Sequence, residues 1–250
     1  MGDTVDLCLV ACRRPDLLEK TLTSFQTNLL SDLRIGAVLA NVDPFMGTEA
    51  EGARTVAVIK SHFPTATVFT PPEPGFTAAV RRVWAASSAG LVFHLEDDWL
   101  LEEHIDPARL ISRLTGDVKA VSLLSAEHGT RGQSQFSESL CRRKILGLPI
   151  GRIREARFNT SPGLFDGPFV RALADLMRTD LDPEKQMRRK GGNRALYSLT
   201  QTARCAFFKA ADGAPIARDI GREWRDQRHL QKVLVDGQSL WISEDRAAVG

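Results

Sequence analysis

The chain has 250 residues, of which 43% are hydrophobic and 26% charged, with 33 Lys+Arg against 31 Asp+Glu. This composition excludes a disordered chain, a collagen-like repeat and a small disulfide scaffold, and it suits one large globular domain. The most apolar charge-free stretch, residues 83–95, is shorter than the roughly 20 residues that a membrane helix needs. Acidic residues 3 and 6 stand where a secretory signal needs basic ones, so we expect a cytoplasmic protein without a transmembrane segment.

The near-neutral total charge conceals an uneven distribution. Residues 1–130 carry a net charge of −6, residues 131–232 carry +10, and residues 233–250 carry −2. This asymmetry is typical of proteins that bind an anionic partner. The cysteines form no C-x-x-C pair and have no histidine at metal-ligand spacing, so we expect free thiols.

Short apolar runs alternate with helical patterns through the first half of the chain. The predicted strands cover residues 5–11, 35–42, 67–70, 91–95 and 118–124. Apolar residues at helical spacing lie between them, and the last helix of this half is predicted over residues 106–114. Parallel strands need such crossover helices, so the pattern predicts an α/β fold with a mostly parallel central sheet flanked by helices.

Beyond about residue 128 the periodicity weakens. Residues 128–139 are predicted to form a loop, residues 168–178 and 183–190 helices, and residues 203–210 a strand. The chain contains no internal repeat and no low-complexity linker. We therefore expect one domain with an elaborated C-terminal half.

Three adjacent carboxylates, Glu96, Asp97 and Asp98, directly follow the predicted strand over residues 91–95. Neighbouring carboxylates repel one another, and a divalent cation relieves that repulsion. Oxygen ligands of this kind suit Mg²⁺ or Mn²⁺, completed by substrate phosphates. The alternative is a solvated acidic turn, but the position at the carboxyl end of a strand favours a ligand site.

Competing nucleotide folds lack their motifs. No G-x-G-x-x-G follows the first predicted strand, and no G-x-x-x-x-G-K-[ST] occurs anywhere in the chain. The sequence therefore argues against a dinucleotide-dependent oxidoreductase and against a P-loop enzyme.

Three segments in order carry a resemblance to a known family. They are the strand and basic-Pro loop LVACRRPDLLEKTLTSF, the strand AVLANVDP, and the helix, strand and triplet GFTAAVRRVWAASSAGLVFHLEDDW. Over residues 5–125 the chain resembles the nucleotide-binding half of a GT-A glycosyltransferase, especially the family-2-like group. Residues 1–127 would then form the nucleotide-sugar-binding half and residues 128–250 the acceptor-binding half of the same domain.

The resemblance implies specific roles for the acidic residues. Asp43 would hydrogen-bond the base of the donor, and the triplet would be an E-D-D version of the D-x-D motif, as in N-acetylglucosaminyltransferases of this fold. Glu96 would lie near the ribose or the metal, Asp97 at the donor, and Asp98 on the metal that bridges the diphosphate. The expected donor is a nucleotide sugar, with UDP as the nucleotide, and the expected metal is Mn²⁺ or Mg²⁺.

Basic residues could stabilise the negative charge that builds up on the leaving diphosphate. Arg13 and Arg14 follow the first strand, where they could lie beside the diphosphate or form a solvated basic loop. Arg222 and His229 belong to the basic segment DIGREWRDQRH. His229 could complete the metal shell or meet the diphosphate, while a surface histidine is the alternative.

The C-terminal half must supply the acceptor site and the catalytic base. By the resemblance, the base lies in about this part of the chain, and we choose Glu184, with Asp182 and Asp166 as rivals. For Asp182 we favour a helix N-cap. Residues 158–165 (FNTSPGLF) resemble an acceptor-side loop, and a packed turn is equally compatible with them.

The basic clusters of residues 142–144, 152–157 and 188–190 would suit a polyanionic acceptor if they shared one face. Duplex DNA with a hydroxymethylated base is one such acceptor. The alternatives are a polysaccharide or lipid-linked acceptor, attraction to anionic lipid headgroups, a non-catalytic nucleic-acid-binding module, or a metal-dependent phosphoesterase.

Overall fold

The structure is a computed structural model, and it describes residues 3–123, 136–138, 140–145, 148–154, 157–235 and 238–243. Most of the loop predicted over residues 128–139 lies outside these ranges. Within them, no helix is both long and apolar enough to span a bilayer. Cys8, Cys12 and Cys205 are free thiols, as predicted.

The first half confirms the predicted alternation of strands and helices. Its strands are β1 (Val5–Ala11), β2 (Ile35–Val42), β3 (Thr67–Phe69), β4 (Leu91–Glu96), β5 (Trp99–Leu101) and β6 (Val118–Ser122). Its helices are α1 (Pro15–Asn28), η1 (Leu30–Asp32), α2 (Glu49–His62), α3 (Phe76–Ala86) and α4 (Pro107–Ile111). Local signals set these boundaries: Pro15 opens α1, a Thr48–Glu51 capping box opens α2, and Asp106 caps α4.

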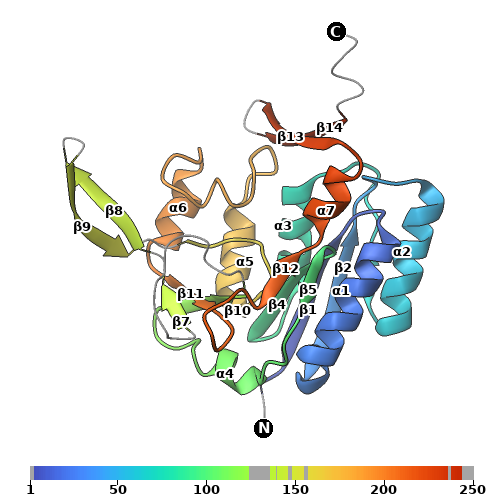
Figure 1. The fold of residues 1–250 in the computed structure, drawn as a ribbon, viewed down its shortest axis with the longest axis horizontal. Helices are drawn as coiled ribbons and strands as arrows, with labels where there is room; N and C mark the ends of the chain where they lie inside the picture. The colour runs from blue at the N-terminus through green and yellow to red at the C-terminus, as the bar shows by residue number, and fades with distance from the viewer. Residues whose placement is uncertain are drawn as a thin grey trace.

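The second half adds shorter elements. They are β7 (Phe136–Glu138), β8 (Leu140–Ile145), β9 (Leu148–Arg154), β10 (Gly163–Asp166), α5 (Gly167–Leu176), α6 (Arg194–Thr200), β11 (Arg204–Phe208), β12 (Ala217–Asp219), α7 (Gly221–Asp226), β13 (Leu230–Val235) and β14 (Gln238–Ser243). The helix predicted over 168–178 and the strand predicted over 203–210 are confirmed by α5 and β11. Figure 1 shows the β8–β9 hairpin projecting from the body of the molecule.

The helix predicted over residues 183–190 is wrong, because this segment forms a series of turns. Gln186, which is fully buried, ties the segment to the end of α5 instead of continuing a helix. Its Oε1 accepts from the backbone N–H of Arg178 (2.9 Å) and its Nε2 donates to the Arg178 carbonyl (3.1 Å). These hydrogen bonds from a side chain to the backbone compete with the helical pattern and outweigh it.

The central sheet has eight strands in the order β3-β2-β1-β4-β10-β6-β11-β7. The pairs β2–β3, β1–β2, β1–β4 and β6–β11 are parallel, whereas β10 runs antiparallel to both β4 and β6. The expected α/β fold with a mostly parallel sheet is therefore confirmed. Because β10 lies between β4 and β6, strands from both halves of the chain form one sheet.

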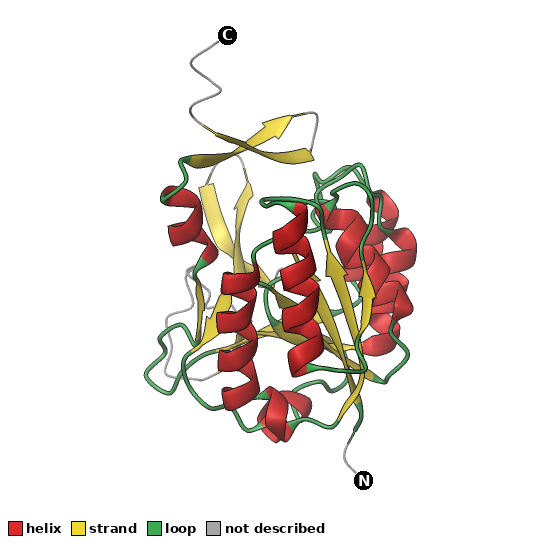
Figure 2. Cartoon of the chain, turned by 90° about the vertical axis from the view of Figure 1, so that its right-hand side faces the viewer, coloured by secondary structure: helices red, strands yellow, loops and turns green. Residues whose placement is uncertain are grey.

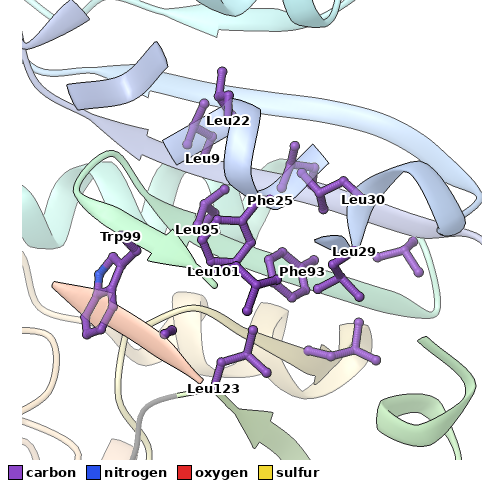
Figure 3. Close-up of a cluster of buried hydrophobic side chains, with 14 of the residues drawn as sticks. Leu9, Leu22, Phe25, Leu29, Leu30, Phe93, Leu95, Trp99, Leu101 and Leu123 are labelled. Carbon is purple, nitrogen blue, oxygen red and sulfur yellow. The ribbon is translucent and has the colours of Figure 1, made fainter. Parts of the chain in front are cut away.

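Helices cover both faces of the sheet (Figure 2), and two apolar clusters result. On one face, Leu22 and Phe25 of α1 pack on Leu9, Phe93 and Leu95, and the rings of Phe25 and Phe93 lie 6.0 Å apart (Figure 3). A second cluster, which contains Val80 and Trp84 of α3 and Val170 of α5, covers the other face. Alternation along β4 thus directs odd-numbered side chains to α1 and even-numbered ones to α3 and α5.

Candidate functional site

The carboxyl ends of three parallel strands bring the acidic and basic loops together. In the pairing of β1 with β2 and β4, Ala11 lies opposite Val42 and Val10 lies opposite Glu96. The loop after each strand therefore begins at the same edge of the sheet, where ligands of open α/β sheets bind. Residues 12–14, 43 and 97–98 occupy these loops.

Asp97 is buried and anchors the loop after β1. Its Oδ2 accepts hydrogen bonds from the backbone N–H of Cys12 (2.9 Å) and from Nε of Arg14 (3.2 Å), while its Oδ1 pairs with Nη2 of Arg14. Burial lowers the pKa of Arg14, but Asp97 and Asp98 outweigh burial and raise this pKa well above its usual value. Both carboxylate oxygens of Asp97 are thus engaged by the protein's own groups.

Asp98 lies under α7, which comes from the far end of the chain. Its Oδ2 is 3.2 Å from Nη2 of Arg14 and 3.3 Å from Nη1 of Arg225, and its carbonyl accepts from the N–H of Ile220 (2.8 Å). A Cβ on Gly221 would lie 2.0 Å from Oδ2, so any larger residue there would displace the Asp98 carboxylate. Burial and the carboxylates of Asp97 and Asp219 raise the pKa of Asp98 to about 6.

Glu96 faces the opposite side of the sheet and meets Glu184. Nε1 of Trp99 donates to Glu96 Oε2 (3.3 Å), while Glu184 Oε1 accepts from the backbone N–H (3.1 Å) and Oγ1 (3.2 Å) of Thr160. Burial, followed by the charges of Asp98 and Glu184, raises the pKa of Glu96 well above its usual value. The structure therefore brings the predicted base, Glu184, to the acidic triplet.

Asp43 lies at the start of α3. Its Oδ1 accepts from Nδ2 of Asn41 (2.7 Å) and its Oδ2 accepts from the backbone N–H of Gly75 (3.0 Å). Burial raises the pKa of Asp43, against the opposing effect of these two donors. Nη1 of Arg82 in turn donates to the Asn41 side-chain oxygen. Asp43 is therefore fixed between β2 and α3 at the same edge as the triplet.

The rival bases are placed differently. Asp182 Oδ1 accepts from the backbone N–H groups of Glu184 (3.1 Å) and Lys185 (3.0 Å), as a helix N-cap would, but the segment that follows forms turns and not the expected helix. Asp166 caps α5 and pairs with Lys119 at 3.0 Å. It lies opposite Leu91, the first residue of β4, and so at the far edge of the sheet from Glu96. Glu184 is the candidate whose charge acts on Glu96 of the triplet, and its hydrogen bonds to Thr160 cap no helix.

The residues predicted near the end of the chain are only partly at the site. Arg222 is exposed and bonds Asp219 at 3.2 Å, whereas Arg225, one helical turn further on, reaches both Asp98 and Asp219. His229 is exposed, with a left-handed φ of 50° just after α7. Sequence reasoning thus found the basic segment DIGREWRDQRH but selected Arg222 as the site residue in place of Arg225.

Trp224 connects α7 to the loop after β1. The guanidinium carbon of Arg14 lies 5.4 Å from the centroid of its ring, and that of Arg228 lies 4.0 Å away. Cation–π contacts of this kind hold a short helix in place. In Figure 1, α7 lies beside the upper ends of the strands of the first half, which is the edge that carries the triplet.

The carboxylates at this edge of the sheet are suitable ligands for a divalent cation. The charges of Asp98 and Glu184 act on Glu96, and those of Asp97 and Asp219 act on Asp98. Arg14 pairs with Asp97 and Asp98, and Arg225 pairs with Asp98 and Asp219. The pKa values of Glu96 and Asp98 are raised first by burial and then by this surplus of negative charge. Among the described residues, no three His, Cys, Asp or Glu side chains form a ready-made metal cage. None is needed where one or two carboxylates bind a metal together with substrate phosphates.

The fold matches that of GT-A-type glycosyltransferases of known structure. Two similar solved structures are the mannosyltransferase PcManGT from Pyrobaculum calidifontis, in complex with GDP-Man and Mn²⁺, and residues 1–349 of TarS from S. aureus, in complex with UDP. They share 14% and 12% sequence identity with this chain, with TM-scores of 0.53 and 0.52. The alignments cover 82% and 83% of this chain but only 54% and 58% of theirs. No protein-family model and no curated protein sequence matches the chain.

Proposed function

We propose that this protein is a metal-dependent glycosyltransferase that moves a sugar from a nucleotide donor to a hydroxyl acceptor. The observation that carries the proposal is that Glu184, from the C-terminal half, and Glu96, from the N-terminal half, share Thr160 as a hydrogen-bond partner and that the Glu184 charge acts on Glu96. The complexes of the two structural relatives with GDP-Man and Mn²⁺ and with UDP support a donor of this class. We take UDP as the donor nucleotide.

The donor would lie along the edge from Asp43 to Asp98. Asp43 is buried at the start of α3, and a carboxylate there can accept a hydrogen bond from the edge of the base. Arg14 and Arg225 would supply positive charge to the diphosphate, since Arg recognises phosphate through several N–H groups at once. Asp97 would act indirectly, by holding Arg14 and the loop after β1 in position.

Asp98 and Glu96 would hold the Mn²⁺ or Mg²⁺ ion, with His229 as a further candidate ligand. A divalent cation bound there supplies Lewis-acid stabilisation of the leaving nucleoside diphosphate. Burial disfavours the ionised form of both carboxylates, so a bound cation, together with the guanidinium of Arg14 beside Asp98, would have to favour that form.

Glu184 would act as the general base. As the acceptor oxygen bonds to the anomeric carbon, its proton passes to the Glu184 carboxylate. The bond from that carbon to the diphosphate breaks, and the electron pair leaves with the phosphate oxygen. Thr160 orients the base through two hydrogen bonds to Oε1, so Oε2 is the oxygen that can face the acceptor.

We further propose a polyanionic acceptor, of which duplex DNA with a hydroxymethylated base is one example. The support is the net charge of +10 over residues 131–232 and the exposure of Arg188, Arg189 and Lys190. Facing phosphates, such residues would give salt-dependent binding. The side chains of the basic residues 142–144, 152 and 154 lie outside the described part of the structure.

The test is turnover of UDP-sugars with Mn²⁺, with water or a supplied hydroxyl compound as acceptor. Glu184→Gln keeps the shape of the side chain and removes the base, so turnover should fall by about 10²–10⁴-fold. Asp180→Asn, in the same segment but paired with Arg178 on the surface, is the matched control and should keep full turnover. Equal turnover of Glu184→Gln and wild type would refute the assigned base.

A further inference from the structure

A second site lies beside the acidic edge, on the face of the sheet that α1 and α2 cover. It is a pocket of about 700 Å³ between the start of α1, the loop after β2 and α7. Its lining residues are Arg13, Arg14, Pro15, Asp16, Leu17, Phe45, Met46, Gly47, Glu51, Trp224, Arg228 and Leu230. Asp43, Glu96 and Asp98 do not line it, whereas Arg14 does, so the pocket adjoins the edge that the donor would occupy and shares one wall with it.

The carboxylates of this pocket already have partners. Asp16 Oδ1 pairs with Nη2 of Arg54 at 3.0 Å. Glu51 Oε2 accepts from the backbone N–H (2.7 Å) and Oγ1 (2.9 Å) of Thr48 in the capping box of α2. Neither acid forms a direct ion pair with the arginines that line the pocket, although the charge of Arg228 acts on Glu51 from a distance.

Two of the three arginines carry charge that the described chain leaves unpaired. Nη1 of Arg13 donates to the carbonyl of Gly47 and Nη1 of Arg228 to that of Trp224, both at 3.4 Å. Across the described ranges, neither guanidinium forms an ion pair with a carboxylate. The third arginine, Arg14, lies between the pocket and the triplet and pairs with Asp97 and Asp98. Two free guanidiniums in one pocket form a site for an anion.

The remaining walls suit a phosphate-bearing ligand with an apolar part. Phe45, Met46 and Trp224 supply apolar surface, and Trp224 is already fixed by Arg228. Met46 adopts a left-handed φ of 61°, a conformation that non-glycine residues rarely hold outside functional loops. The start of the 14-residue helix α1 opens into the pocket, and no described side chain caps it, which adds favourable N–H groups.

The pocket and the base lie on opposite faces of the sheet. Glu96 and Glu184 lie on the α3 and α5 side, whereas Asp97 and Arg14 lie on the α1 side. An extended acceptor could therefore place a hydroxyl at Glu184 while another part of it crosses the edge and reaches the pocket. Such an arrangement needs more than one anionic group along the acceptor, as a polyanion provides.

We propose that this pocket binds a phosphate group of the acceptor, held by Arg13 and Arg228. The inference rests on the proposed function, which supplies the acceptor, but the pocket can be tested without it. The same chemistry would bind the diphosphate of the donor, so the experiment must separate these two sources of phosphate.

The experiment measures two affinities by calorimetry, for inorganic phosphate alone and for UDP with Mn²⁺. The variants are Arg228→Gln and the double variant Arg13→Gln/Arg228→Gln. Both side chains are at least partly exposed, so folding should be retained. Arg54→Gln is the matched control, because Arg54 lies on the same side, pairs with Asp16 and does not line the pocket.

We expect phosphate affinity to fall by at least tenfold in the double variant and by less in Arg228→Gln, while the affinity for UDP with Mn²⁺ changes by less than twofold. Arg54→Gln should alter neither. Phosphate affinity equal to that of wild type, or no phosphate binding by wild type, would overturn the site. Loss of UDP affinity in the double variant would show that the pocket binds the diphosphate of the donor, and would overturn the proposal that it binds a phosphate of the acceptor. If wild type binds phosphate but not UDP with Mn²⁺, the proposed donor chemistry fails while the pocket stands.

Discussion

Replacing Asp97 with Asn tests whether a buried ion pair holds the edge of the sheet together. The change keeps the size of the side chain. It also keeps a side-chain oxygen for the backbone N–H of Cys12, whose nitrogen lies 2.9 Å from Oδ2 of Asp97 in the wild-type protein. It removes the negative charge that pairs with Arg14, whose side chain is only 8% exposed. Arg14 would then be a buried cation with one of its two carboxylate partners missing.

The expected loss in the free energy of unfolding depends on the partner that Arg14 retains. Removing one partner of a buried pair costs about 3–5 kcal/mol when the other charge is left unpaired. Because Arg14 keeps Asp98 at 3.2 Å, we expect the lower end of that range, about 3 kcal/mol. Each kcal/mol shifts the Tm of a chain of this size by roughly 2–4 °C, so the Tm should fall by about 6–12 °C.

The assay is thermal unfolding followed by circular dichroism at pH 7, repeated in urea to obtain the free energy of unfolding. Asp16→Asn is the matched control, since Asp16 also pairs with an arginine but the two side chains are 83% and 63% exposed. Exposed pairs contribute little to stability, so its Tm should match that of wild type. A Tm for Asp97→Asn within 2 °C of wild type would refute the reasoning.

Two further predictions concern acid stability and metal affinity. Burial raises the pKa of Asp6, but three backbone N–H bonds outweigh it, and the net pKa lies below 3.8. A carboxylate of lowered pKa stabilises the fold above about pH 4 and loses that effect as the pH falls through the folded-state pKa. Urea titrations should therefore show Asp6→Asn least stable relative to wild type at pH 7, with the difference shrinking below pH 4. Arg225→Gln removes a cation from Asp98, so Mn²⁺ without nucleotide should bind about fivefold tighter by electron paramagnetic resonance, equivalent to about 1 kcal/mol. Arg222→Gln should leave Mn²⁺ binding unchanged. Weaker Mn²⁺ binding by Arg225→Gln would contradict the idea that Arg225 and the metal ion compete for Asp98.

The sequence predicts the first half of the fold well because its signals are local. Apolar runs, Pro15 and the capping residues set β1 to β4 and α1 to α4 without reference to the rest of the chain. The same order of strands places Asp43 and the triplet at one edge, since the carboxyl ends of parallel strands share it. These residues could be found from the sequence because each one directly follows a predicted strand.

The second half could not be predicted in the same way, because distant contacts decide it. β10 is only four residues long and is a strand because β4 and β6 pair with it on both sides. The turns over residues 183–190 depend on buried Gln186, which bonds the end of α5. Arg225 reaches Asp98 because β12 pairs with β5 and delivers α7 to the triplet, which no local pattern reveals.

The place of β10 in the sheet also governs how the chain can be made. A ribosome delivers the chain from its N-terminus, so β4 has only β1 beside it until residues 163–166 emerge and pair with its other edge. In that interval the apolar strand LVFHLE offers unpaired N–H and C=O groups to any neighbouring chain. A nascent or truncated product that ends near residue 127 would therefore aggregate. Synthesis of the second half protects the first half during biogenesis, before any substrate is bound.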